Sequence, residues 1–263
     1  MIKRAMKKSR LHNDAWILEQ EISRNFDLAS KEYDNYALVQ KKAAYICTQM
    51  VMQSNEHFHS ILDVGTGTGF VVENLLKLFP QAVYTLNDIS SQMLEQTKKK
   101  FSNLPNMEYY LVNAENYIFP KSPYNLIVSN LAIQWFKNLE QGILNLWQQT
   151  NNILAFSTLC CGSFSSWKRE CKKANLPCKM EIFPSFDSLK KKCLNLNPQK
   201  ANFKLQKETL SFSSPLDFVR YLKKLGAHSS KKEQTICDLR KILKQCPSGI
   251  MAEYNIFHGV LKK

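Results

Sequence analysis

The sequence predicts an α/β fold: a doubly wound, mostly parallel, seven-stranded sheet with a helical cap inserted late in the chain. Short apolar runs alternate with helical patterns of about ten residues up to Leu159, which is typical of strands joined by right-handed crossovers. Three glycines stand within five positions directly after the first apolar run, where such folds turn from a strand into a helix. After Thr158 the rhythm changes to pairs of helices that separate the last strands.

The individual elements follow from the apolar spacing and from the turn residues between them. Residues 25–53 carry apolar positions at helical spacing, and Pro80 ends the helix that follows the glycines. Ser90 or Ser91 can serve as the N-cap of the next helix. We expect strands at 60–65, 82–88, 107–115, 124–132, 153–159, 202–213 and 251–263. We expect further helices at 70–79, 90–101, 139–150, 163–174, 185–194, 215–227 and 231–246.

We expect the chain to form one main domain. Residues 1–24 are predicted to be a basic N-terminal extension, and residues 25–263 a single domain with cap helices within about 160–245. No internal repeat or low-complexity linker divides this region, and 263 residues are enough to bury a full core.

The chain is strongly basic: 36 lysines and arginines outnumber 22 aspartates and glutamates, giving a formal net charge of +14. This charge favours an acidic partner such as nucleic acid, an anionic membrane or an acidic protein, although scattered lysines also fit a solvated surface. The eight cysteines lack metal-ligand spacing, so we predict no metal site and reduced thiols. Without a signal peptide or a membrane-spanning apolar run, we expect a cytoplasmic protein that does not bind membranes.

The segment ILDVGTGTGF, residues 61–70, places three glycines between an apolar strand and a helix. In this arrangement backbone N–H groups and the helix N-terminus face a ligand beyond the strand ends. The glycine spacing differs from that of dinucleotide-binding loops, and the lysine of a P-loop is missing. Asp88 ends the second strand, where its carboxylate can accept hydrogen bonds from both hydroxyls of a ribose. The alternatives are a tight turn without a ligand and an aspartate that caps the next helix.

The pattern Asp63-x-Gly65-x-Gly67-x-Gly69, followed by Asp88, resembles motifs I and II of the class I S-adenosylmethionine methyltransferases. The resemblance implies a Rossmann-like sheet and S-adenosylmethionine as the cofactor. It places Asp63 near the methionine ammonium group and the glycines against the methionyl and ribose portions. The residues that it implies for cofactor binding are Tyr33, Asp63, Gly65, Thr66, Gly67, Gly69, Asp88, Ile89, Met93, Asn113, Ala114 and Asn130.

Asn113 is the departure from this pattern that bears on cofactor binding. It lies in VNAE, residues 112–115, where many members of the superfamily have an aspartate that binds the adenine amino group. An amide oxygen can still accept that hydrogen bond. Thr66 replaces a common cysteine or alanine, and Ile89 and Met93 either flank the adenine ring or pack in the core.

Four further segments resemble the BioC family, the malonyl-[acyl-carrier protein] O-methyltransferases of biotin synthesis. The stretch YNLIVSNLAIQWFKNLEQGI at 124–143 resembles that family closely, and segments 25–44, 154–171 and 218–229 with 254–263 agree in order. The resemblance thus covers residues 25–263. It implies methyl transfer from S-adenosylmethionine to the free carboxylate of a malonyl thioester, on acyl-carrier protein or coenzyme A, at the start of pimeloyl and biotin synthesis.

Methyl transfer to a carboxylate needs little chemical participation from side chains. A malonyl carboxylate is ionised near neutral pH and is already a nucleophile, so we assign no residue to proton transfer. Rate is expected from in-line placement and from removal of water. The expected substrate contacts are Tyr33 at the methionine end, Gln134 and Trp135 along the acyl chain, and Arg220, Lys223 and Lys224 at the carboxylate. Each of them has a packing role or a solvated surface position as its alternative.

Three other functions remain open at this point. A methyltransferase of a small carboxylic acid such as aconitate would share the fold and motif I. An RNA methyltransferase would suit the charge, although residues 129–132, SNLA, differ from the NPPY-like tetrapeptide of amide-selecting enzymes. A basic nucleic-acid-binding protein could keep the fold without activity. We expect instead a monomer that binds no nucleic acid and that docks an acidic carrier protein on the late helices, near Arg220, Lys223, Lys224, Lys231 and Lys232.

Overall fold

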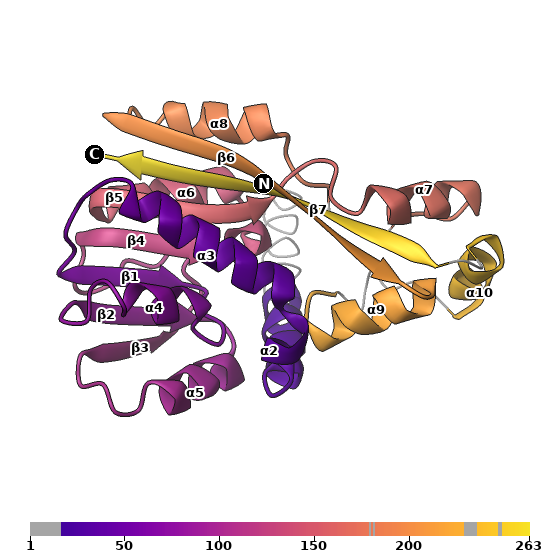
Figure 1. The fold of residues 1–263 in the computed structure, drawn as a ribbon, viewed down its shortest axis with the longest axis horizontal. Coiled ribbons are helices and arrows are strands. Elements are labelled where there is room, and N and C mark those ends of the chain that lie inside the picture. The colour runs from indigo at the N-terminus through magenta and orange to yellow at the C-terminus, as the bar shows by residue number, and fades with distance from the viewer. Residues whose placement is uncertain (1–16, 179, 181, 229–235, 247–248) are drawn as a thin grey trace, which may run out of the picture.

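The computed structural model describes residues 17–178, 180, 182–228, 236–246 and 249–263 (Figure 1). Residues 17–29 are helical, and the short helix α2 (Tyr33–Tyr36) leads into α3 (Leu38–Met52). The later helices are α4 (Phe70–Leu75), α5 (Ser91–Lys100), α6 (Leu139–Gln148), α7 (Ser165–Lys173), α8 (Phe186–Leu194), α9 (Pro215–Lys224) and α10 (Ile236–Gln245), with a 3-10 turn η1 (Ile133–Trp135). Helix α4 is shorter than expected because residues 76–78 form turns ahead of Pro80. Ser90 caps α5, since its hydroxyl accepts a hydrogen bond from the Met93 N–H at 3.1 Å.

Seven strands form one sheet in the order β3-β2-β1-β4-β5-β7-β6. They are β1 (Ser60–Val64), β2 (Val83–Asp88), β3 (Met107–Leu111), β4 (Tyr124–Asn130), β5 (Thr150–Leu159), β6 (Lys200–Phe212) and β7 (Ile250–Lys262). Strands β1 to β5 pair in parallel, whereas β7 runs antiparallel to both β5 and β6. The predicted doubly wound, mostly parallel, seven-stranded sheet is therefore confirmed. Its order reverses between β1 and β4, where sheets of this kind bind ligands.

The central strands are buried on both faces, which explains why they read as continuous apolar runs. Ile61 and Leu62 are neighbours in β1, yet they pack in different hydrophobic clusters. The cluster of Ile61 includes Ala43 and Cys47 of α3, and the cluster of Leu62 includes Leu146 of α6. Helices therefore cover both faces of the sheet, as alternating crossovers require.

Of the late helices, α7, α9 and α10 form the expected cap, whereas α8 packs on β6 and β7. In the chain, α7 and α8 stand between β5 and β6, and α9 and α10 stand between β6 and β7. Figure 1 shows α7, α9 and α10 gathered at one end of the β6–β7 ribbon, away from β1, β2 and β3. The division into an extension and one domain stays a prediction, although the helix of residues 17–29 runs across the boundary expected at residue 24.

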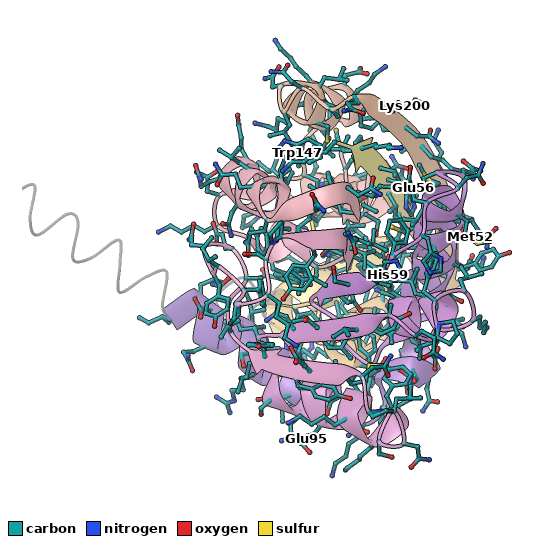
Figure 2. All side chains as sticks on the ribbon, turned by 90° about the vertical axis from the view of Figure 1, so that its left-hand side faces the viewer. Met52, Glu56, His59, Glu95, Trp147 and Lys200 are labelled. Carbon is teal, nitrogen blue, oxygen red and sulfur yellow. The ribbon has the colours of Figure 1, made fainter. Side chains whose placement is uncertain are left out.

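The two edges of the parallel strands differ in what they carry. Figure 2 views the edge where these strands begin, with Glu56 and His59 just before β1 and Lys200 at the start of β6. Glu56 accepts a hydrogen bond from the Asn152 amide at 2.9 Å and forms an ion pair with Lys262, so it links β5 to β7. The opposite edge receives the glycine loop, helix 17–29 and the cap. In the portion of the chain that the structure describes, no helix is long and apolar enough to cross a membrane.

Candidate active site

The loop after β1 turns the chain sharply into α4. Its glycines all have positive φ, of 67° at Gly65, 56° at Gly67 and 89° at Gly69, a region that side chains disfavour. A Cβ atom at Gly65 would lie 2.3 Å from the Cβ of Ala132, and one at Gly69 would lie 2.6 Å from the Phe101 ring. A Cβ at Gly67 would meet no heavy atom within 4 Å. Gly65 and Gly69 therefore permit close packing, whereas Gly67 keeps space open for a ligand.

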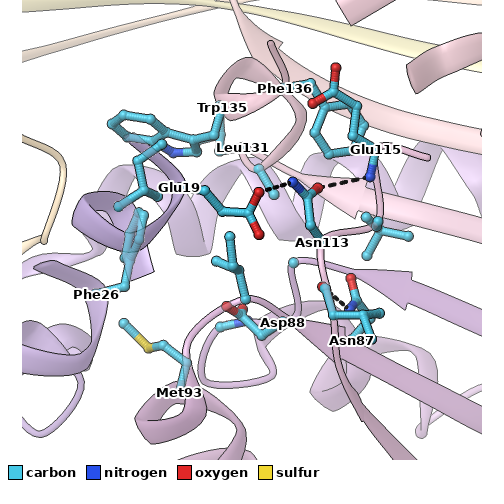
Figure 3. Close-up of a pocket in the computed structure, with 18 of the residues that line it drawn as sticks. Glu19, Phe26, Asn87, Asp88, Met93, Asn113, Glu115, Leu131, Trp135 and Phe136 are labelled. Atoms are coloured by element: carbon cyan, nitrogen blue, oxygen red, sulfur yellow. Dashed lines mark hydrogen bonds between the residues drawn. The ribbon is translucent and has the colours of Figure 1, made fainter. Parts of the chain in front are cut away.

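A cavity of about 420 Å³ opens beside this loop, at the carboxyl ends of β1, β2, β3 and β4. Its volume is in the range of small-molecule sites. Figure 3 shows how side chains from separate segments converge on it. The predicted residues that line it are Tyr33, Gly65, Gly67, Asp88, Ile89, Met93, Asn113, Ala114, Asn130 and Trp135. The structure thus brings most of the predicted site together at the switch point of the sheet.

Several predicted residues lie outside the lining. Asp63, Thr66 and Gly69 belong to β1 and to the loop behind the residues that face the cavity. Gln134 is engaged in its own turn, because its amide nitrogen donates to the Leu131 carbonyl at 2.6 Å.

Throughout the described ranges, no group of three or more histidine, cysteine, aspartate or glutamate side chains is placed to hold a metal ion.

Arg220 and Lys223 of α9 also lie outside the lining, which does not agree with their expected contact to a substrate carboxylate. Both are exposed, and the Arg220 guanidinium is 3.3 Å from the Asp217 carboxylate of the same helix. Helix α9 is amphipathic: Phe218 and Tyr221 are buried, so the basic side chains cover its solvent-facing side. The structure therefore does not place these cations at the cavity.

Asp88 presents its carboxylate to the cavity from the end of β2. Its Oδ2 accepts a hydrogen bond from the Gly67 N–H at 2.8 Å, and its Oδ1 accepts one from the Ser90 N–H at 2.9 Å. Burial raises the pKa of this carboxyl to about 6, and the backbone donors oppose that shift. The remaining lone pairs can accept hydrogen bonds from a pair of ribose hydroxyls.

Asp63 lies in β1 below the glycine loop and is 1% exposed. Neither carboxylate oxygen makes a hydrogen bond of normal geometry. Burial raises the pKa of this carboxyl to about 7, and the negative charge of Asp88 adds to the shift. A buried carboxylate without a partner is costly, and a cationic ligand group would offset that cost. The two acids therefore fit a ligand with a ribose and a positively charged tail, as S-adenosylmethionine has.

The end of β4 forms a rigid wall of the cavity. Leu131 has a φ of 49°, which is unfavourable for a residue other than glycine. Asn130 supports this turn: its amide nitrogen donates to the Gln40 carbonyl at 3.0 Å, and its amide oxygen accepts from the Ser157 hydroxyl at 2.7 Å. Such strain persists where the surroundings over-determine it, so Asn130 acts here as a support of the wall.

Helix 17–29 closes the cavity, and sequence reasoning missed it. Leu18, Glu19, Ile22 and Phe26 all contribute to the lining. The Phe26 ring packs edge-on against Trp135, with centroids 5.7 Å apart and planes at 87°. The spacing of these residues fits one face of a helix, but the basic composition of the first 24 residues favoured a solvated extension.

Comparison with known proteins agrees with this geometry. A family model described as a methyltransferase domain matches residues 61–151. A malonyl-[acyl-carrier protein] O-methyltransferase of Neorickettsia risticii is 31% identical over 244 residues, which cover 92% of this chain and 96% of the relative. Another, of Acetivibrio thermocellus, is 32% identical over 238 residues, which cover 85% of this chain and 82% of the relative.

Solved structures share the fold at low sequence identity. YcgJ from Bacillus subtilis superposes with a TM-score of 0.57 at 13% identity, over 83% of this chain and 98% of that one. The plantazolicin methyltransferase BpumL superposes with a TM-score of 0.53 at 16% identity, over 97% of this chain and 99% of that one. The fold, the cavity and the matched domain define a class I methyltransferase. More narrowly, the chain belongs to the family of malonyl-[acyl-carrier protein] O-methyltransferases.

Replacing Asp88 should weaken cofactor binding. Asp88→Ala removes a charged acceptor for two ribose hydroxyls, so the affinity for S-adenosylhomocysteine should fall by about 1–3 kcal/mol in titration calorimetry. Asp88→Asn keeps the size of the side chain and should lose less. Unchanged affinity in a variant with a native circular dichroism spectrum would remove Asp88 from the ribose site.

Asp63 should make the stability of the ligand-free protein depend on pH. Its pKa is about 7 in the folded chain against an ordinary value of 3.8, so the folded state binds the extra proton between these values. The contribution of Asp63 to the free energy of unfolding is therefore largest below about pH 4 and declines as the pH rises through about 7. Asp63→Asn should reduce this slope and raise the unfolding temperature at pH 8.

Thermal denaturation at pH 6 and pH 8 measures this effect. Asp187→Asn, at an exposed position of α8, is the matched control and should keep the wild-type slope. If Asp63→Asn does not reduce the dependence of thermal stability on pH, another group binds the extra proton of the folded state.

Proposed function

We propose that this chain transfers a methyl group from S-adenosylmethionine to the free carboxylate of a malonyl thioester on acyl-carrier protein, at the start of pimeloyl and biotin synthesis. The observation that carries the proposal is the arrangement of two acids beside one cavity: Asp88 at its rim, and behind it the buried Asp63, whose carboxylate makes no hydrogen bond of normal geometry. This arrangement suits a cationic adenosyl ligand, and membership of the malonyl-[acyl-carrier protein] O-methyltransferase family supports the acceptor.

The cofactor end of the site depends on groups that are already held in place. S-Adenosylmethionine, when bound, supplies an activated methyl group. Asp88 accepts hydrogen bonds from the ribose hydroxyls, and Asp63 offsets the positive charge of the methionyl end. Gly67 lets the ligand approach the backbone, while Ile89 and Met93 offer apolar surfaces to the adenine ring. These contacts orient the ligand without moving a proton.

The acceptor carboxylate has to be positioned by the protein, but it does not have to be activated. Its carboxylate is ionised near neutral pH and is itself the nucleophile, so no residue has to act as a general base. The protein contributes by aligning the carboxylate with the methyl group and by excluding water. Phe26 and Trp135 pack together at the wall of the cavity and limit the entry of water there.

Three tyrosines from separate elements lie near one another at the acceptor side. Tyr33 lines the cavity and packs against the core cluster that contains Tyr221 of α9 and Tyr254 of β7. Tyr221 and Tyr254 are 9% and 3% exposed, and neither hydroxyl makes a hydrogen bond of normal geometry. Burial raises the pKa of all three phenols, and the contact between the Tyr221 and Tyr254 hydroxyls lowers the pKa of Tyr221 and raises that of Tyr254 further.

These buried hydroxyls suit the carboxylate of the acceptor. A phenol that stays protonated can donate a hydrogen bond, and a buried phenol that lacks a hydrogen bond of normal geometry gains from a ligand that accepts one. We therefore propose Tyr33, which lines the cavity, as a donor to the malonyl end, together with Tyr221 and Tyr254, which lie outside the lining in the cluster that Tyr33 packs against. Because these donors are neutral, they hold the carboxylate without neutralising the charge that makes it nucleophilic.

Family membership supports an acidic carrier protein, rather than nucleic acid, as the partner, and the net charge of +14 suits such a partner. Exposed lysines raise the encounter rate with an acidic protein over roughly one Debye length. Of the expected docking residues, Lys223 and Lys224 are exposed on α9, where Lys224 is ion-paired with Glu32, and Lys231 and Lys232 lie outside the described residues. We infer a cytoplasmic monomer that methylates malonyl groups while they remain bound to carrier protein or coenzyme A, and that binds neither nucleic acid nor membrane.

Labelled S-adenosylmethionine tests the acceptor directly. Malonyl-carrier protein should gain a methyl ester, detected by mass spectrometry, whereas acetyl-carrier protein, which lacks the free carboxylate, should not. Equal labelling of both would place the methyl group on the carrier protein itself and refute ester formation. Faster methylation of aconitate than of malonyl-carrier protein or malonyl-coenzyme A would establish the small-acid function instead.

Removal of the tyrosine hydroxyls tests the acceptor site. Tyr221→Phe and Tyr254→Phe should each raise the KM for malonyl-carrier protein about tenfold or more, since a hydrogen bond to a charged group contributes roughly 1.5–3 kcal/mol. Affinity for S-adenosylhomocysteine and thermal stability should stay near the wild-type values. Tyr124→Phe is the matched control, because this hydroxyl is also buried and makes no hydrogen bond of normal geometry, but stands at the start of β4. If Tyr221→Phe and Tyr254→Phe have the same KM for malonyl-carrier protein as the control Tyr124→Phe, the two hydroxyls do not belong to the acceptor site.

A further inference from the structure

The edge of the cavity opposite Asp88 holds a carboxylate from the first described helix. Glu19 lines the cavity, and its Oε2 accepts a hydrogen bond from the Asn113 amide nitrogen at 2.8 Å. Figure 3 shows this contact between helix 17–29 and the segment after β3. The two residues are 94 positions apart in the chain, so the contact exists only in the folded protein.

The hydrogen bonds of Asn113 fix the orientation of its amide. Its oxygen accepts from the Glu115 N–H at 3.0 Å, while its nitrogen faces Glu19. A flipped amide would set its NH₂ group against the Glu115 N–H and its oxygen against the Glu19 carboxylate, which are two repulsive contacts. The Asn113 oxygen, which we expected to accept the adenine amino group, is therefore already engaged with the backbone.

We propose that Glu19 supplies the acceptor for the exocyclic amino group of adenine, through its second carboxylate oxygen, Oε1. The proposal rests on the assignment of S-adenosylmethionine as the methyl donor. With the ribose at Asp88, the base extends one glycosidic bond away, along the apolar walls formed by Ile89 and Val112. The polar edge of the base then reaches the segment that carries Asn113 and the Glu19 carboxylate beside it.

Helix 17–29 is held firmly enough for such a contact to be specific. The Ser23 hydroxyl donates to the Ile89 carbonyl at 3.0 Å. Asp27 Oδ1 accepts from the Ser90 hydroxyl at 2.6 Å and from the Gln92 N–H at 3.0 Å. The helix is thus bound to the segment that flanks the base, and Glu19 lies two turns of helix before Asp27 on the same side. A charged acceptor in a partly closed site gives a stronger hydrogen bond than a neutral amide would.

Two ligands that differ at position 6 of the purine, and in the proton that the 6-oxo form carries on N1, test this role. S-Adenosylhomocysteine donates a hydrogen bond from its amino group there, whereas S-inosylhomocysteine accepts one at its oxygen. Wild-type protein should bind the adenosyl form more tightly. In Glu19→Gln the new amide oxygen faces Asn113, so its NH₂ group faces the base. Affinity for the adenosyl ligand should then fall about tenfold in titration calorimetry, while affinity for the inosyl ligand should hold or rise.

Two further variants separate recognition from a structural tether. Glu21→Gln removes the same charge from the same helix at a position outside the cavity lining, and it should keep the wild-type preference. In the double variant Glu19→Gln/Asn113→Asp, the carboxylate stands at position 113 and accepts from the NH₂ group of Gln at position 19. The amide oxygen of that Gln then faces the base, so the preference for the adenosyl ligand should return. If Glu19→Gln lowers the affinity for both ligands equally, Glu19 only holds the helix in place, and the proposal is overturned. Failure of the wild-type protein to bind either ligand would instead refute the assignment of the cofactor.

Discussion

The Asp88 carboxylate, bonded to the Gly67 and Ser90 N–H groups, is the contact on which the rest of the site depends. One oxygen fixes the glycine loop after β1, and the other fixes the start of α5. Ser90 in turn donates to Asp27, so the same contact extends to helix 17–29, which covers the cavity. Because the carboxylate also faces the cavity, a ligand that binds there stabilises the loop, the start of α5 and the covering helix together.

The sheet and the cofactor end could be predicted from the sequence because both depend on local patterns. Ile61 and Leu62 are both apolar because a parallel strand under helices is buried on its two faces. Ser90 was recognisable as a cap because its hydroxyl serves an N–H only three positions away. Gly67 and Asp88 could be paired because neighbouring parallel strands end at the same edge of the sheet.

The proposed contacts to the adenine amino group and to the acceptor carboxylate could not be predicted, because residues far apart in the chain make them. Glu19 belongs to a segment whose basic composition indicated an extension, and its contact with Asn113 depends on how that helix folds back. Tyr221 and Tyr254 look like ordinary core phenols until the folded chain shows that their hydroxyls are buried and make no hydrogen bond of normal geometry. Arg220 matched a carboxylate in charge, but charge alone does not reveal which face of a helix meets solvent.

The net charge of +14 conceals an opposite local charge at the cavity. Its lining includes the acids Glu19, Asp88 and Glu115 as well as Lys137, and Asp63 lies directly behind. Salt screens exposed charges within roughly 8 Å, whereas buried charges are screened much less, so the two sets can act separately. Surface lysines can attract an acidic carrier from a distance while the buried acids hold a cationic cofactor. Neutral tyrosines can then receive the acceptor carboxylate without competing with either set of charges.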